Sequence, residues 1–445
     1  MDLTTIDACR VCGNAQLETV FDIGLQYLQG SFVMQGMESP SRDKIPMELL
    51  RCDTGSQPGA CGLVQLRHQV PPAVLYANYW YTSGTTATMS DHLQSIAATA
   101  IEHANFVESR VLDIGCNDGT LLANFPADIE QWGIDPSDIA ATVPDSVNLV
   151  QDVFPSATLR SQLRAQSGEQ TFDVVTSIAM YYDLSDPTEF AREVERLLAD
   201  DGIWIVEMSY LPMMLGMNSL DTICHEHLEY YSLAVLDHIA KSVGMRIVNA
   251  KLNAINGGSI QLLLCKTGSE RLTEPAPALA ILREYETRIG LDTSRPLLDF
   301  VARVEQQRQE MIDLVQSIRD RGETIHVYGA STKGNVLIQW YGFDHQQLPF
   351  AADRNPKKVG ARTVGTDIAV ISEAESRAMR PDYYLVLPWH FRREFLEREK
   401  DIILAGTRMI FPLPELLVVD IDNYDAALES SLDHLRAFLL QVGLD

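Results

Sequence analysis

The chain has 445 residues, 46% of them apolar, which is enough for two or three domains that each bury a core. Its formal net charge of −26 argues against nonspecific nucleic-acid binding, although a local basic patch can still hold an anionic small molecule. No apolar run is long enough to span a membrane, and residues 1–10 lack the pattern of a signal peptide. We therefore expect a cytoplasmic protein, a monomer or homodimer, with no nucleic-acid or membrane partner.

Four of the seven cysteines lie near the start of the chain: Cys9, Cys12, Cys52 and Cys61. Without a secretion signal, such a cluster favours a metal over disulfides. Two residues separate Cys9 from Cys12, so both thiolates can face one ion, and the more widely spaced second pair can complete a tetrahedral zinc site. A closed site of four thiolates is structural, with no open position for catalysis. The alternative is four reduced cysteines without metal.

Residues 1 to about 70 are rich in turns and show no strong helical period. After them, helical patterns over 91–104 and 187–198 alternate with apolar runs that read as strands: 110–114, 131–134, 172–177 and 202–208. This alternation predicts a doubly wound parallel sheet. Two further strands, 245–252 and 259–266, are separated by the turn at 256–258 and could close the sheet with an antiparallel edge.

Residues 276–321 are predicted to form a helical pair broken near Pro296. A second βα system follows, with strands at 324–328, 348–352, 382–387 and 407–410 and helices at 335–341 and 423–442, the last with apolar residues on one face. The fold class is therefore α/β, and we expect three domains: residues 1–72, a zinc-binding domain; residues 73–275, the first sheet; and residues 276–445, a helical connector with a Rossmann-like domain.

The stretch Val111–Thr120 is an apolar strand that ends in Asp113 and a glycine-rich turn before a helix. Glycines let a ligand approach the backbone, and the turn lacks the three-glycine dinucleotide spacing. It resembles the first signature of class I S-adenosylmethionine methyltransferases. Asp135, at the next strand end, could accept both ribose hydroxyls. The resemblance implies a set of donor-binding residues: Asp113, Gly115, Asn117, Asp118, Asp135, Tyr81 and Asp152, the last at the adenine amine.

Residues 221–232 place two histidines, two glutamates and two tyrosines in one short segment at the carboxyl edge of the first sheet, where substrates bind. The helical His-Glu-x-x-His spacing of zinc proteases is absent, so roles in general base catalysis or hydrogen bonding are favoured over metal ligation. A plain structural loop is the alternative. The aromatic and hydroxyl side chains of residues 79–85 could stack on and hydrogen-bond a sugar, or simply pack at a domain junction.

Residues 328–335 resemble a glycine turn at a helix N-terminus, which suits a phosphate group. The stretch 353–360 adds positive charge after the next strand. The substrate-binding candidates here are Lys333, Asn335 and Arg354. The alternative is a vestigial turn that serves only the fold.

Taken in order, these motifs resemble the sugar C-methyltransferases of deoxysugar biosynthesis over nearly the full length of the chain. The motifs that carry the resemblance are residues 9–13, 79–84, 113–119, 225–227 and 329–334. The family has three domains, a structural zinc ion and S-adenosylmethionine as methyl donor. Its members methylate a nucleotide-linked 4-keto-6-deoxyhexose at the carbon beside the ketone, between the second and third domains.

The resemblance implies that His227 is the base, with Glu226 orienting its ring and His225 beside them. It also implies that Tyr81 and Tyr79 contact the sugar. Two positions depart from the family: Tyr181 stands where a histidine is common, and Cys224 where a tyrosine is common. Tyr181 could still donate a hydrogen bond to an enolate, whereas Cys224 is a poor replacement for a phenol.

Two rival functions remain open at this point. The protein could methylate oxygen or nitrogen of a related small molecule, because a histidine base can also activate a hydroxyl. It could instead be a non-catalytic, zinc-containing binding module that keeps a methyltransferase fold. The complete set of donor-binding residues argues against the second rival.

Overall fold

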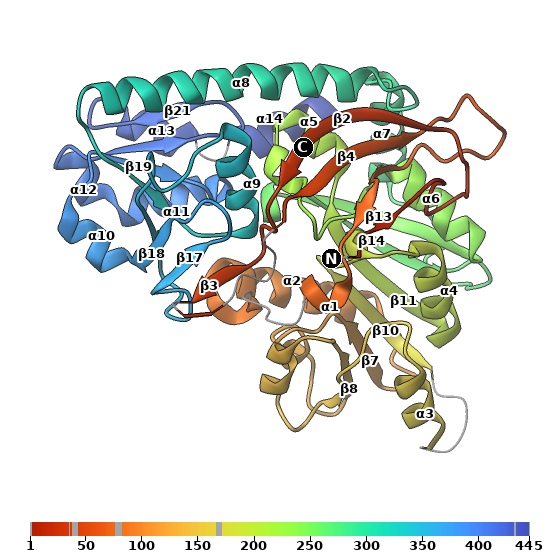
Figure 1. The fold of residues 1–445 in the computed structure, drawn as a ribbon. Helices are drawn as coiled ribbons and strands as arrows, with labels where there is room; N and C mark the ends of the chain where they lie inside the picture. The colour runs from red at the N-terminus through yellow and green to blue at the C-terminus, as the bar shows by residue number, and fades with distance from the viewer. Residues whose placement is uncertain are drawn as a thin grey trace.

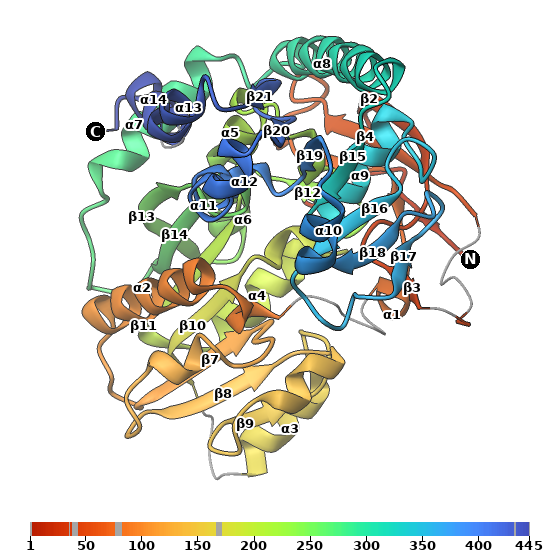
Figure 2. The same cartoon turned by 90° about the vertical axis from the view of Figure 1, so that its left-hand side faces the viewer.

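The computed structural model describes residues 2–34, 36–37, 43–75, 82–165, 171–430 and 433–444. Their strands form sheets of two, four, seven and eight strands. Figures 1 and 2 show the parts of the chain that carry the two large sheets side by side, with the long helix α8 (Arg295–Asp320) running across the top of Figure 1. The predicted α/β class, with two βα systems behind a small N-terminal part, is confirmed.

The seven-stranded sheet holds the first βα system. Its central strand β10 (Phe172–Ile178) is almost wholly buried, as expected of an apolar strand covered on both faces. Five strands are parallel and two form the predicted antiparallel edge, in the order β13 (Met245–Asn253), β14 (Ser259–Lys266), β11 (Leu198–Ser209), β10, β7 (Arg110–Ile114), β8 (Glu130–Ile134) and β9 (Asn148–Val150). The prediction missed β9, because three residues are too few to show a period.

Helices flank this sheet. Helix α2 (Ala87–His103) and helix α4 (Pro187–Leu197) pack against β11, while α6 (Leu233–Ser242) and α7 (Pro277–Arg288) pack against β13. Side-chain caps set where α2 and α4 begin: Thr86 accepts a hydrogen bond from the Met89 N–H, and Asp186 from the Glu189 N–H. Shorter helices complete this half: α1 (Pro72–Leu75), α3 (Ala157–Ala165) and α5 (Leu211–Gly216).

The four-stranded sheet belongs to the N-terminal part, with one exception. Strands β2 (Leu17–Gln26), β4 (Ile45–Cys52) and β5 (Val64–Leu66) pair antiparallel, and the fourth strand, β12 (Glu229–Tyr230), comes from the segment after β11. Conversely, β3 (Phe32–Met34) leaves this part and joins the eight-stranded sheet, and β1 (Thr4–Thr5) pairs only with β6 (His68–Gln69). The sheets thus exchange strands across the boundaries expected at residues 72 and 275, which stay predictions.

The eight-stranded sheet holds the second βα system, in the order β21 (Leu417–Val419), β20 (Arg408–Phe411), β19 (Tyr383–Val386), β15 (Ile325–Tyr328), β16 (Phe350–Asp353), β18 (Ala369–Ser372), β17 (Ala361–Thr363) and β3. Its helices are α9 (Thr332–Tyr341), α10 (Glu373–Met379), α11 (Arg392–Arg398) and α12 (Lys400–Leu404). The single helix predicted over 423–442 is replaced by two, α13 (Tyr424–Glu429) and α14 (Asp433–Val442).

Helix α8 joins the parts. Its 26 residues make it about 39 Å long at 1.5 Å per residue. It contacts α5 of the first βα system, α9 of the second and β2 of the N-terminal part (Figure 1). Its buried side chains recur every three or four residues, or at multiples of that spacing: Leu297, Phe300, Val304, Met311, Val315 and Ile318. Within the described ranges, none of the helices combines the length and the apolar character needed to cross a membrane.

Candidate active site and zinc centre

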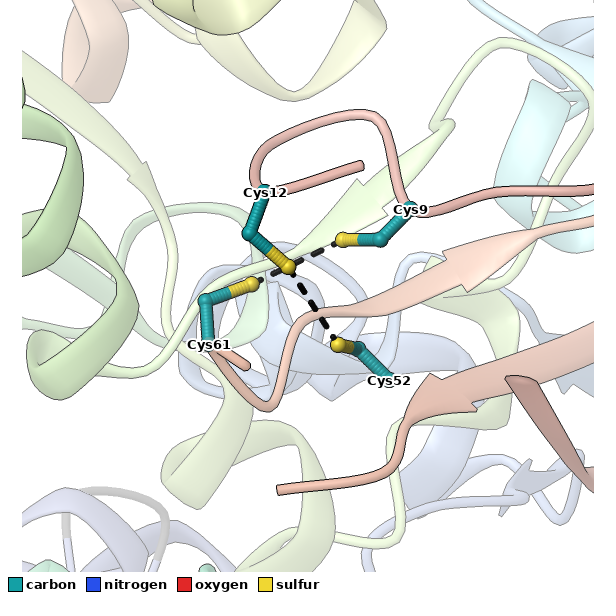
Figure 3. A group of neighbouring side chains, drawn as sticks. All are labelled: Cys9, Cys12, Cys52 and Cys61. Atoms are coloured by element: carbon teal, nitrogen blue, oxygen red, sulfur yellow. Dashed lines mark hydrogen bonds between the residues drawn. The ribbon is translucent and has the colours of Figure 1, made fainter. Parts of the chain in front are cut away.

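The four predicted metal-binding cysteines meet at one point, where their sulfur atoms face one another (Figure 3). All four sulfurs lie within 4.8 Å of each other; Cys9 is 3.6 Å from Cys61 and Cys12 is 3.5 Å from Cys52. A tetrahedron with zinc–sulfur bonds of about 2.3 Å has its sulfurs about 3.8 Å apart, so the cluster fits a single ion. The separations are too long for disulfides, and all four cysteines are free.

Backbone contacts preset this cluster. The Gly13 N–H donates to the Cys9 carbonyl at 2.9 Å, in a turn that needs the positive φ of +69° at Gly13. The Asn14 amide donates to the Cys52 sulfur at 3.4 Å. Such a donor outside the ligand set holds a thiolate in the orientation that a metal requires.

A first cavity, of about 340 Å³, opens at the carboxyl ends of β7, β8, β9 and β10. This is the edge at which parallel sheets bind ligands. Five of the predicted donor-binding residues line it: Asp113, Gly115, Asn117, Asp135 and Asp152. Asp183 and Glu207 also line it, and none of the described lining residues is a lysine or arginine. A cavity with five carboxylates and no side-chain cation favours a positively charged ligand.

Asp113 is one of the two most deeply buried of these carboxylates, with Glu207. It is 3% exposed, and the Thr176 hydroxyl donates to its Oδ1 at 2.6 Å. Burial raises the pKa of Asp113 to about 7, and the nearby Asp135 charge adds to the shift. A cation bound in the cavity would favour the ionised form of this carboxyl group.

Asp135 and Asp152 end the next two strands. Asp135 accepts hydrogen bonds from the backbone N–H groups of Asn117 at 2.9 Å and Ser137 at 2.8 Å, which fix its orientation. Asp152 accepts from the Ser156 hydroxyl at 2.7 Å, and this bond holds its pKa below the usual range. Asp152 is therefore ionised, and both carboxylates lie where hydroxyl and amine groups of a nucleoside could bind.

The turn after β7 also anchors the start of α2. The Asn117 Oδ1 atom accepts from the Ser83 N–H at 2.9 Å, and the Asp118 Oδ2 atom accepts from the Gly84 N–H at 2.8 Å. Asp118 is not among the residues that line the cavity, and its predicted donor-binding role stays a prediction. Tyr79 and Tyr81 lie outside the described residues, and their predicted roles stay predictions.

Sequence reasoning missed Glu207, a buried residue at the end of β11 that lines the first cavity. Its carboxylate is 2.6 Å from the His92 Nε2 atom and accepts from the amides of Asn253 and Gln261, each at 3.0 Å. The signal was present in the sequence: like Asp113, Glu207 is a lone carboxylate near the end of an apolar strand run, Ile203–Val206.

His227 sits in the segment between α5 and β12 and is 8% exposed. Its Nδ1 atom is 2.7 Å from the Thr222 carbonyl oxygen. Burial lowers the pKa of His227 to about 3, and the nearby positive charge of Lys333 adds to the shift. The ring packs on Tyr182, with centroids 4.2 Å apart, and Tyr182 stands between two residues of the first cavity, Met180 and Asp183.

The neighbours of His227 differ from expectation. No hydrogen bond links the side chains of Glu226 and His227, and the Glu226 carboxylate lies beside Gly30 instead. Burial raises the pKa of Glu226 to about 7. His225 is 2% exposed, its backbone N–H donates to the Gln29 Oε1 atom at 3.2 Å, and its ring lies beside the Ile45 backbone in the N-terminal part. Cys224 is fully buried, and its predicted contact with the substrate stays a prediction.

Tyr181 does not point toward a substrate as predicted. Its hydroxyl donates to the Pro187 carbonyl at 2.8 Å, and its ring packs among Phe190, Trp204 and Tyr231 in the core. The next residue, Tyr182, is the one that contacts His227. The short 3₁₀ turn Tyr181–Asp183 decides which of the two neighbouring tyrosines faces the core.

The predicted phosphate-binding turn after β15 is filled by the protein itself. A side chain at Gly329, whose φ is +86°, would place its Cβ 2.5 Å from the Pro388 Cγ atom, and one at Gly334 would place it 2.9 Å from the Leu387 Cβ atom. At the end of β16, Asp353 accepts from the Ala330 N–H at 2.8 Å. The glycines thus admit the chain that follows β19, which favours the structural alternative.

The three substrate-binding candidates of this region are engaged by protein groups. Lys333 donates to the Asn256 carbonyl at 2.6 Å and to the Thr222 hydroxyl at 3.3 Å. Asn335 donates to the Gln29 carbonyl at 2.7 Å, which corrects its predicted role to one of holding the N-terminal segment. Arg354 forms a surface ion pair, 3.3 Å from Glu394.

A second cavity, of about 400 Å³, lies between the two βα systems. The turn at residues 254–258 separates it from the first cavity. Ile255 and Asn256 line the first cavity, whereas Ala254, Gly257 and Gly258 line the second. Its wall includes two aromatic rings, three arginines and one acidic side chain: Trp389, Phe391, Arg392, Arg393, Arg436 and Glu394. Arg392 donates to the Ser430 carbonyl at 2.7 Å and Arg393 lies 2.9 Å from Glu397, so two of the arginines have protein partners. The positive charge beside flat rings still favours an anionic ligand with a flat ring.

Comparison with known proteins agrees with this layout. Three family models match in order: a zinc binding domain at residues 9–76, a methyltransferase domain at 81–250 and a C-methyltransferase C-terminal domain at 254–414. The C-methyltransferase NovU of Streptomyces niveus is 29% identical over 426 residues, which cover 94% of this chain and 98% of that protein. A tRNA U34 carboxymethyltransferase of Sulfurimonas denitrificans is 28% identical over 112 residues, 25% of this chain and 38% of that one.

Solved structures resemble only part of the chain. A methyltransferase in complex with the Trm112 activator of Haloferax volcanii covers 40% of this chain and 92% of its own, with a TM-score of 0.32 and 16% identity. The CcbJ methyltransferase of Streptomyces caelestis covers 42% and 99%, with a TM-score of 0.31 and 16% identity.

The matched domains and the cavity at the strand ends define an S-adenosylmethionine-dependent methyltransferase. The chain is a methyltransferase of the three-part type, with a zinc-binding domain in front and a C-methyltransferase C-terminal domain behind. The resemblance to C-methyltransferases inferred from the motifs is confirmed.

We expect the purified protein to contain one zinc ion per chain, measured by plasma mass spectrometry. Cys52→Ser should lower the zinc content well below one and reduce the melting temperature, because a structural zinc site contributes directly to folding. Cys265→Ser, at a buried cysteine outside the cluster, should retain the metal. Full zinc occupancy in Cys52→Ser would contradict the four-cysteine site.

Donor affinity should depend on pH through Asp113. A cationic donor favours the ionised carboxylate, so calorimetry should show its affinity rising from pH 6 to pH 8 as Asp113, with its pKa near 7, loses its proton. Asp113→Asn should weaken binding and abolish this pH dependence. Asp152→Asn should weaken binding but keep the dependence, since Asp152 is already ionised; the same pH dependence in Asp113→Asn would refute the assignment.

Gly329→Ala should destabilise the protein more than Gly360→Ala. Both glycines have positive φ, but only at Gly329 would the added Cβ overlap another residue. We expect losses of about 3 kcal/mol and about 1 kcal/mol in the free energy of unfolding, the difference arising from overpacking. Urea unfolding measures both; equal losses would show that Pro388 moves aside without cost.

Proposed function

We propose that the enzyme transfers a methyl group to the carbon beside the ketone of a nucleotide-linked keto-deoxysugar, with His227 as the base. The contact between its Nδ1 atom and the Thr222 carbonyl carries this proposal. A carbonyl oxygen can only accept, so Nδ1 holds the proton and Nε2 keeps a lone pair. Because burial lowers the pKa of His227 to about 3, the imidazole is neutral near neutral pH and its Nε2 lone pair is free. The same shift weakens the ring as a base, so the proton transfer depends on stabilisation of the enolate by a neighbouring charge.

The reaction needs two transfers. Nε2 of His227 takes the hydrogen on the carbon beside the carbonyl as a proton, and the electron pair left behind spreads onto the ketone oxygen as an enolate. That electron pair then forms the bond to the methyl carbon while the bond from this carbon to sulfur breaks, which leaves a neutral thioether. The sulfonium donor supplies the activated methyl group; the protein's part is to hold the two partners next to each other.

The two cavities support two ligands of opposite charge. The acidic first cavity suits a donor that carries a sulfonium and an ammonium group. The second, with its arginines and aromatic rings, suits the diphosphate and base of a nucleotide. They meet at the turn 254–258, where the Lys333 ammonium group contacts the Asn256 carbonyl. The positive charge of Lys333 would stabilise an enolate formed near this turn. The same charge disfavours the protonated form of His227.

His227→Ala should bind the donor with unchanged affinity and lose at least about 100-fold in turnover, the range of a missing general base. Deuterium incorporation from heavy water at the carbon beside the ketone, followed by NMR, should also be lost. The same spectra separate a new C-methyl from an O-methyl or N-methyl group.

His225→Asn is the matched control, since that ring is buried against the N-terminal part. Its turnover should stay within several-fold of the unsubstituted enzyme. Unchanged turnover in His227→Ala would remove His227 from the base role, and an O-methyl product would overturn the proposed reaction.

A further inference from the structure

The segment that carries His227 is tied to the zinc-binding part by backbone bonds. The Leu66 N–H donates to the Leu228 carbonyl at 2.8 Å, and strand β12 pairs with β5, Glu229 lying opposite Gln65. From the other side, the Leu228 N–H donates to the Tyr182 carbonyl at 2.7 Å. The residue that follows His227 is therefore clamped between two parts of the molecule.

One side chain from between the zinc ligands reaches this segment. Arg10, which follows Cys9, has its Nε atom 3.6 Å from the Glu229 Oε1 atom, and the two side chains are 3% and 0% exposed. Arg10 also donates through Nη1 to the Leu66 carbonyl at 2.7 Å, next to the bond between Leu66 and Leu228. One guanidinium group thus contacts both strands of the clamp.

The contact between Arg10 and Glu229 tolerates little change, because both side chains are buried and neither can turn to water for a new partner. The Leu184 backbone lies beside the Glu229 carboxylate, and Arg10 is the cation that faces it, 3.6 Å away. At that separation the Arg10 Nε atom donates no hydrogen bond, so the contact is one of charge and packing. Removing one partner of a buried pair leaves an unpaired charge, which is far more costly than removing both. The carboxylate of Glu229 is consequently held wherever the loop Cys9–Cys12 places Arg10.

We propose that Arg10 is a positioning residue that transmits the geometry of the zinc loop, through Glu229, to the base His227 two residues earlier in the chain. The zinc-binding part then sets the position of the catalytic segment in addition to stabilising the fold. The catalytic consequence rests on the proposed role of His227, whereas the mechanical link does not.

The test compares Arg10→Gln, Glu229→Gln and the double variant with Arg67→Gln. Arg67 follows Leu66 and forms an ion pair with Glu48 in the same sheet; this pair is more exposed and does not involve Glu229, so Arg67→Gln is the control for losing an arginine from this sheet. Amide hydrogen exchange of peptides covering 222–231 is measured by mass spectrometry, together with zinc content, donor affinity, kcat and KM.

Arg10→Gln should exchange at least tenfold faster over 222–231 and lose at least tenfold in kcat. Zinc content, donor affinity and KM should stay within threefold, a split that general destabilisation would not produce. The double variant should exchange no faster over 222–231, and have no lower kcat, than the more impaired of the two single variants, because it leaves no unpaired buried charge. Exchange and kcat equal to those of Arg67→Gln would overturn the proposal.

If Arg10→Gln does not fold, Arg10→Lys decides the question, because it keeps the charge but loses the contact with the Leu66 carbonyl. It should show intermediate exchange, and exchange like that of the unsubstituted protein would overturn the proposal. Exchange needs no sugar substrate, so the mechanical link can fail or hold independently of the proposed reaction. His227→Ala tests that reaction separately.

Discussion

The main constraint on this enzyme is that two cavities of opposite charge preference meet at a single turn, residues 254–258. Parallel strands end together at one edge, so the carboxylates that follow β7, β8 and β9 converge without long loops. The second cavity takes its arginines from the C-terminal part. A net charge of −26 is therefore compatible with an anionic substrate, because the basic groups are local to one cavity.

A base beside these cavities must be neutral and fixed in direction. The proposed base, His227, would meet both needs through its surroundings rather than through a carboxylate partner: burial and Lys333 keep it uncharged, and the Thr222 carbonyl sets its tautomer. Lys333 comes from the C-terminal part and Thr222 from the methyltransferase part, joined by a hydrogen bond of 3.3 Å. Assembly of the parts is thus a condition for a competent base, which gives a physical reason for α8 and the exchanged strands β3 and β12.

Features whose cause is local could be predicted from the sequence. The strands Arg110–Ile114 and Ser259–Lys266 match to the residue, because turn residues bound their apolar runs. The cysteines converge because their spacing encodes the ligand geometry. Strands β3 and β12 could not be predicted, since they have three and two residues and their partners lie far away in the chain.

The same distinction applies to the site. Five carboxyl-edge residues of the first cavity were predictable, because a polar residue at the end of an apolar strand marks that edge. Which tyrosine contacts His227, Tyr182 or Tyr181, depends on one 3₁₀ turn and could not be predicted. The contact of His227 with the Thr222 carbonyl could not be predicted either, because every residue has a backbone carbonyl. The glycine turn at 329–334 was over-read as a ligand site, because close packing by Pro388 needs glycine just as a phosphate does.

The most direct test of this account is whether the two cavities fill independently. Thymidine and uridine diphosphate should be titrated by calorimetry into the protein, alone and saturated with S-adenosylhomocysteine. The account predicts that at least one diphosphate binds, with an affinity that S-adenosylhomocysteine changes by less than about threefold and that Arg392→Gln or Arg393→Gln weakens. Competition between diphosphate and S-adenosylhomocysteine would place both in one cavity and contradict it.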